Sequence, residues 1–86
     1  MEKTNIVMVV DPPGFYLASG NPAIAVPDGN LRDLLSVAHK YDAQYLILET
    51  GSIPKELESV FDFPTSQEGL NYLGSIDGTK LYAIQH

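Results

Sequence analysis

Three acidic residues, Asp11, Asp28 and Glu49, each come at or near the end of a short apolar run. If the three runs are parallel strands, their carboxyl ends meet at one edge of the sheet, where open α/β sheets usually bind their ligands. Carboxylate oxygens at that edge could hold Mg²⁺ or act as a general base on a hydroxyl group. A site for a small polar ligand or a divalent cation is therefore the first chemical hypothesis.

The same three acids also have a structural interpretation. Asp11 and Asp28 precede predicted helices, where an aspartate caps free backbone N–H groups and interacts favourably with the helix dipole. Glu49 fits a loop residue that faces water. Phosphoryl-transfer sites in addition need a lysine or a hydroxyl side chain in register with the acids, and none is evident. We favour the structural interpretation and expect no catalytic residue.

Other catalytic motifs are missing from the sequence. The segment Asp11-Pro12-Pro13-Gly14 is neither a Walker A loop nor a dinucleotide-binding glycine motif, and its prolines lack the N–H groups that would bind phosphate. The chain contains no cysteine, which excludes disulfides, thiolate metal sites and a thiol nucleophile. Ser19 and Ser52 lie near glycines but outside the Gly-x-Ser-x-Gly motif. We expect no cofactor and no metal centre.

Composition and charge limit the classes of partner. The 86 residues are enough for one compact domain, and eleven acidic against five basic residues give a formal charge of −6. Because the basic residues are scattered, we expect no nucleic-acid partner and no electrostatic attachment to anionic lipid. The longest apolar runs, such as Ile6 to Val10, are far shorter than the roughly 20 residues that span a bilayer. Taken alone, the chain should be soluble.

Apolar runs and helical spacing predict an α/β fold. The segments Ile6 to Val10, Ala23 to Val26 and Tyr45 to Leu48 are short and continuously apolar, as strands covered on both faces are. A short helix from Pro12 should end at Gly20. A second helix is predicted by one apolar stripe of five residues: Leu31, Leu34, Leu35, Ala38 and Tyr41. The alternation implies parallel pairing through right-handed crossovers.

The C-terminal part of the chain predicts a hairpin. Asp77-Gly78 is a strong signal for a type I′ turn between a strand at Tyr72 to Ile76 and a last strand at Thr79 to Ile84. The last strand is apolar on both faces, so we place it inside the sheet. The predicted fold is a three-layer-like, mostly parallel five-stranded sheet of order 2-1-3-5-4 with strand 5 antiparallel. A third short helix could begin at Pro54, before a polar loop from Asp62 to Gly69.

Two adjacent aromatic residues, Phe15 and Tyr16, are candidates for contact with a partner. They follow Pro12-Pro13 in the first predicted helix. A helix that packs on a sheet buries only one of two adjacent side chains well, so the other could contact a neighbour outside the domain. Packing in the core of the domain is the ordinary alternative for both.

The segment from Asn5 to Pro27 resembles the soluble C-terminal region of polytopic GT-C-type membrane glycosyltransferases, relatives of the dolichyl-phosphate-mannose-protein mannosyltransferases. In those proteins a strand is followed by a Pro-Pro or Asn-Pro turn, an aromatic helix ending in Gly-x-Pro, an apolar strand and a Pro-x-Gly turn. The resemblance continues through the following residues: Leu34-Leu35, Tyr41, Tyr45 to Leu48, Leu73-Gly74, Asp77-Gly78 and Leu81-Tyr82.

This resemblance implies that the chain is a domain excised from a longer membrane protein. The parent would transfer a sugar from a polyprenyl-phosphate donor, and this part would lie on the extracytoplasmic side of the cytoplasmic membrane. Its partner would be the membrane portion of its own parent chain, with a glycan or small ligand as a further candidate. The catalytic acids of such enzymes lie in the membrane portion, so the resemblance assigns no catalytic residue here.

Two other hypotheses remain open. A free-standing module could bind a small ligand or a divalent cation at Asp11, Asp28 and Glu49. An interaction domain could instead form oligomers through a sheet edge at the second or fourth strand.

Overall fold

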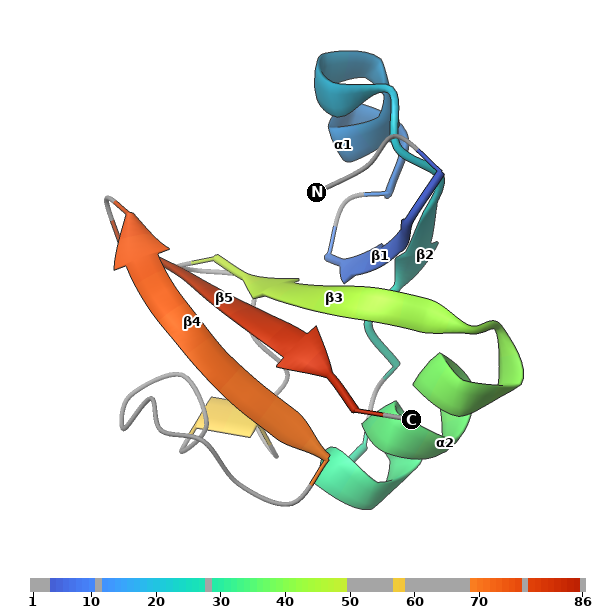
Figure 1. Cartoon of the computed structure of the whole chain (residues 1–86), viewed down its shortest axis with the longest axis vertical. Coiled ribbons are helices and arrows are strands. Elements are labelled where there is room, and N and C mark those ends of the chain that lie inside the picture. Colours follow the sequence, from blue (N-terminus) through green and yellow to red (C-terminus); the bar gives the residue numbers. More distant parts are fainter. Residues whose placement is uncertain are drawn as a thin grey trace.

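The computed structural model describes residues 4–10, 12–27, 29–49, 57–58, 69–76 and 78–85. Helices and strands alternate along the first half of the chain, and two strands close it (Figure 1). The elements are β1 (Ile6–Val9), α1 (Pro12–Ser19), β2 (Ala23–Ala25), α2 (Leu31–Lys40), β3 (Ala43–Leu48), β4 (Leu70–Ile76) and β5 (Thr79–Ile84).

The strands form one mixed sheet of order β2-β1-β3-β5-β4. β1 pairs in parallel with both β2 and β3, and β5 runs antiparallel between β3 and β4. The predicted α/β class, strand order, antiparallel fifth strand and C-terminal hairpin are all confirmed. The buried run at Val7, Met8 and Val9 explains the central place of β1, since a strand between two neighbours and two helical layers has no face left for water.

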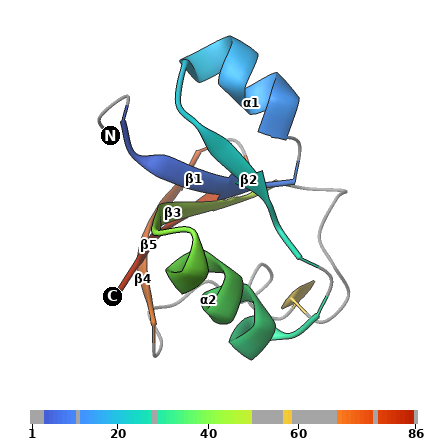
Figure 2. The same ribbon diagram turned by 90° about the vertical axis from the view of Figure 1, so that its right-hand side faces the viewer.

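The helices lie on opposite faces of the sheet. Figure 2 shows α1 above β1 and β2 and α2 below the sheet. This follows from the strand order, because the chain moves from β1 to β2 in one direction and from β2 to β3 in the other, and right-handed crossovers then place the two helices on different sides. Around β1 the domain therefore has three layers.

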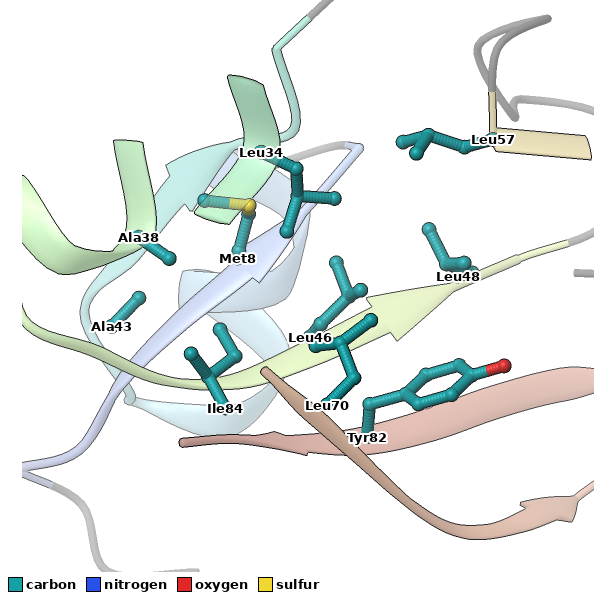
Figure 3. Packing of buried hydrophobic residues seen from close by; sticks show 10 residues of the cluster. All are labelled: Met8, Leu34, Ala38, Ala43, Leu46, Leu48, Leu57, Leu70, Tyr82 and Ile84. Atoms are coloured by element: carbon teal, nitrogen blue, oxygen red, sulfur yellow. The ribbon is translucent and has the colours of Figure 1, made fainter. Parts of the chain in front are cut away.

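The main core lies between α2 and the sheet. Leu34 and Ala38 of α2 face apolar side chains from β1, β3, β4 and β5 (Figure 3). β5 contributes the alternate residues Tyr82 and Ile84, as a pleated strand must, whereas the core residues of β3 are Ala43, Leu46 and Leu48 because its register against β1 shifts between Ile6 and Val7. The fully or almost fully buried members are Met8, Leu34, Ala38, Ala43, Leu46, Leu48, Leu57, Leu70, Tyr82 and Ile84.

Helix α2 begins with a capping box. The Asn30 side chain accepts a hydrogen bond from the Asp33 backbone N–H at 3.0 Å, and the Asp33 carboxylate accepts one from the Asn30 N–H at 3.2 Å.

At the C-terminal end of α2, the prediction for Tyr41 is wrong: it is the C-cap residue and is 51% exposed instead of lying on the buried stripe.

The hairpin and the two sheet edges have irregular features. Ile76 pairs with Thr79, and Gly78 has φ +83°, the left-handed conformation that a type I′ turn requires. On the β4 edge the register shifts between Tyr72 and Gly74, so that Leu73 is an extra residue in the strand. On the other edge, β2 has only three residues.

The predicted third helix and the loop after it lie mostly outside the described residues. Leu57 and Glu58 are described there, and Leu57 is fully buried in the main core. Among the described helices, none is long and apolar enough to cross a bilayer.

Candidate functional site

The carboxyl ends of β1, β2 and β3 lie at one edge of the sheet. Val9 pairs with Ala25 in β2, and Met8 pairs with Leu46 in β3, so the three parallel strands end side by side. The chain crosses over in opposite directions on the two sides of β1, which makes the gap between β1 and β3 a topological switch point. The carboxyl ends of these strands, where the sequence predicts the acid site, are therefore the place where ligands of open α/β sheets bind.

Only one of the three predicted acids can be placed at this edge. Glu49 directly follows β3 and is exposed, as a loop residue facing water should be. Asp11 and Asp28 lie outside the described residues. In the part of the chain that is described, no group of three histidine, aspartate or glutamate side chains could hold a metal ion. The acid site stays a prediction at a suitable place in the fold.

The second candidate is the surface around Phe15 and Tyr16 on α1. The end of this helix is held by a local hydrogen-bond network. The Ser19 hydroxyl donates to the Phe15 carbonyl at 2.7 Å and accepts from the Asn21 N–H at 3.1 Å. The Asn21 side chain, almost completely buried, donates to the Asn5 carbonyl at 3.2 Å. These bonds fix the end of α1 to the segment that precedes β1.

Although it is fixed in place, α1 buries none of its side chains completely. Phe15 is half-buried, while Tyr16 is 56% exposed, so Tyr16 is the more exposed of the two. The neighbouring Leu17 is 85% exposed. The sequence Pro-Pro-Gly-Phe-Tyr-Leu-Ala-Ser contains no charged residue. A helix that is apolar on all sides normally lies inside a larger structure.

The sheet face on the same side as α1 is also incompletely covered. α1 packs on β1 and β2 (Figure 2), and Val7 and Val9 of β1 are buried. Beyond them, no described helix covers this side of β3, β5 and β4. Four side chains of this uncovered part point away from the main core and are half-buried: Tyr45, Ile47, Leu81 and Ala83.

This uncovered part corrects one prediction. The continuous apolar run of β3 was expected to be covered on both faces, but Tyr45 and Ile47, which point away from α2, are only half-buried. On this face Tyr45 stands opposite Ala83 and Ile47 opposite Leu81, so cross-strand neighbours contribute to the partial burial. Periodicity shows that both faces are apolar and does not show what covers them.

No match identifies the chain. Comparison with protein-family models, with curated proteins and with solved structures finds no relative. The candidate sites therefore rest on the sequence and the geometry.

Sequence reasoning missed Leu17, the most exposed large apolar side chain on α1. A signal for it was present. Phe15, Tyr16, Leu17 and Ala18 occupy four consecutive positions of an eight-residue helix, and four consecutive positions point to all sides of a helix. At least one of them had to face away from the sheet.

Proposed function

We propose that this chain is a non-catalytic accessory domain of a polytopic membrane glycosyltransferase. It lies on the extracytoplasmic side and packs against the membrane portion of its own parent chain, or helps that portion to hold its acceptor or glycan. The identity of the parent rests on the resemblance of the segment from Asn5 to Pro27. The observation that carries the packing role is the uncharged helix α1 with Leu17 85% exposed.

The exposed apolar area favours a protein neighbour over water. Full burial of a leucine contributes about 1.5–3 kcal/mol, and Leu17 obtains little of this within the domain. A single exposed leucine is common on protein surfaces. Here Tyr16 is exposed beside it, and the helix has no charged side chain that would make exposure of this surface to water favourable. The half-buried side chains of β3 and β5 add further apolar area on the same side of the sheet.

The first test is the reading frame that encodes the chain. The proposal requires several apolar segments of roughly 20 residues on the N-terminal side of Met1 in the parent protein. A reading frame without such segments would contradict it.

The second test places a charge on α1 in the parent enzyme. Leu17→Lys should lower sugar transfer or the yield of assembled enzyme several-fold, because a charged group would then face the membrane portion. The same substitution should leave the stability of the isolated 86-residue chain nearly unchanged. Leu17 is 85% exposed, so little burial is lost, and a cation in the last turn interacts favourably with the helix dipole. Ser36→Lys, at an exposed position of α2, is the matched control. Equal activity and yield for wild type and Leu17→Lys would exclude α1 as the contact.

A further inference from the structure

A groove of about 570 Å³ lies along α2, away from both sites described above. One wall consists of α2 and the other of the start of β4 and the end of β5, which come together beside the helix (Figure 1). This volume is within the range of about 300–1,000 Å³ that is typical of small-molecule sites. The described residues that line it are Leu31, Arg32, Leu35, His39, Gly69 and Gln85.

Hydrogen bonds hold the two walls together. His39 Nε2 is 2.9 Å from the Gln85 backbone carbonyl, which joins α2 to the end of β5. The Gln85 N–H donates to the Gly69 carbonyl at 2.9 Å, and the Gln85 side-chain nitrogen donates to Asn71 Oδ1 at 2.8 Å. The strand wall is therefore fixed before any ligand arrives, which reduces the entropic cost of binding.

The shape of the groove depends on a glycine. Gly69 has φ +84°, and a Cβ atom at this position would lie 2.6 Å from Leu35 Cδ1. The β4 wall thus approaches the helix closely at Leu35 without a side chain of its own. Leu31 and Leu35 form an apolar floor that is partly buried against the main core.

The described lining residues of the groove differ in charge from the chain as a whole. The chain has a formal charge of −6, yet none of the described lining residues is acidic and one is arginine. Arg32 is exposed and forms no ion pair with any residue that the structure describes. A guanidinium group binds a carboxylate through two parallel hydrogen bonds. One cation above an apolar floor suits a singly charged carboxylate better than a phosphate, whose two charges and strong hydration call for more donors.

The polar groups are spaced along the helix. Arg32 and His39 are seven residues apart, which corresponds to about 10 Å along the axis of α2. His39 marks the end of the groove where Gln85 lies. The Gln85 side-chain oxygen accepts no hydrogen bond from the described residues, so it can accept one from a hydroxyl group of a ligand.

From these features we propose that the groove binds a small organic monocarboxylate with an apolar body. The carboxylate pairs with Arg32, and the body lies on Leu31 and Leu35. A hydroxyl group at the far end donates to the Gln85 side chain. This inference is independent of the proposed accessory role, because it concerns α2 and the strand ends and makes no use of α1.

The probe for this proposal is 3-(4-hydroxyphenyl)propionate, which has a carboxylate, an apolar ring and a hydroxyl group in a row. Titration into ¹⁵N-labelled chain should give saturable amide shifts that centre on Leu35, Gly69 and Gln85. The neutral amide of the same compound should bind more weakly by roughly tenfold or more, because it lacks the charge-assisted bond.

Two variants separate the groove from general electrostatics. Arg32→Gln should weaken binding of the carboxylate by roughly tenfold or more. Lys40→Gln removes a cation of the same helix whose ammonium lies 5.5 Å from the centroid of the Tyr41 ring, outside the groove, and should leave the affinity unchanged. Both positions are exposed, so circular dichroism should show an intact fold for each variant. The proposal is overturned by unsaturable shifts at millimolar probe, by equal binding of the amide, or by equal affinity of Arg32→Gln and wild type.

Discussion

Replacing Leu34 and Leu17 by alanine, one at a time, makes the same chemical change on two helices with opposite expected results. Leu34 is fully buried in the main core, between α2 and the sheet. A buried leucine-to-alanine change costs about 2–5 kcal/mol, because it removes transfer free energy and leaves a cavity. An 86-residue domain has a total stability of about 4–13 kcal/mol. Leu34→Ala should therefore remove a large part of it.

Leu17 provides the matched control for this experiment. It is 85% exposed, so only a small fraction of its side chain leaves water on folding. The lost burial is about 0.2–0.5 kcal/mol, and the slightly higher helix propensity of alanine offsets part of it. Leu17→Ala should change the free energy of unfolding by less than about 0.5 kcal/mol.

Urea unfolding followed by far-UV circular dichroism measures both changes. The m-value should stay constant, since neither substitution alters the surface exposed on unfolding by much. A loss above about 1 kcal/mol for Leu17→Ala would show that this side chain packs within the domain, and α1 would no longer be a candidate contact. A loss below about 1 kcal/mol for Leu34→Ala would refute the packing of α2 on the sheet.

Two further predictions use the same titrations. Asn30→Ala should lower the free energy of unfolding by about 1 kcal/mol, because it removes the acceptor for the Asp33 N–H. Asn30→Asp should keep most of this stability, since aspartate is also a good N-cap. Equal losses for the two variants would argue against the capping box. Gly20→Ala should cost about 1–2 kcal/mol for its φ of +79°, with open space around the new methyl group. Gly69→Ala should cost at least about 1 kcal/mol more, because its Cβ also meets Leu35; similar losses for both glycines would contradict that close approach.

The strand order was predictable because local signals and general rules agreed. Short apolar runs separated by a helix imply parallel pairing, and Asp77-Gly78 implies an adjacent antiparallel strand. Only a few arrangements satisfy both conditions. The apolar last strand then had to lie inside the sheet, and it does so between β3 and β4.

The boundaries and the outer surfaces were less predictable. Tyr41 fits the helical spacing, but the helix ends at Lys40, and periodicity carries no information about such an end. Tyr45 and Ile47 are apolar whether a helix or only their cross-strand neighbours cover them. For the acid site, the meeting of three parallel strand ends was predicted correctly, whereas the binding of a ligand by Asp11, Asp28 and Glu49 remains a prediction.

The groove along α2 could not have been predicted from sequence patterns. Arg32 and His39 belong to the helix, while Gly69 and Gln85 come from strand ends that are remote in the chain. The bond between His39 and Gln85 spans 46 positions. A site of this kind depends on tertiary packing, and none of its residues belongs to a recognisable motif.

The irregular edge strands β2 and β4 limit how copies of this chain can associate. The shift at Leu73 interrupts the regular backbone of β4, and β2 has only three residues, with Pro27 close behind it and without an amide hydrogen to offer. Neither edge is a good template for adding a strand from another molecule. Contacts between copies would therefore have to use side chains, such as the exposed Tyr16 and Leu17 of α1, and not a sheet continued from one molecule to the next.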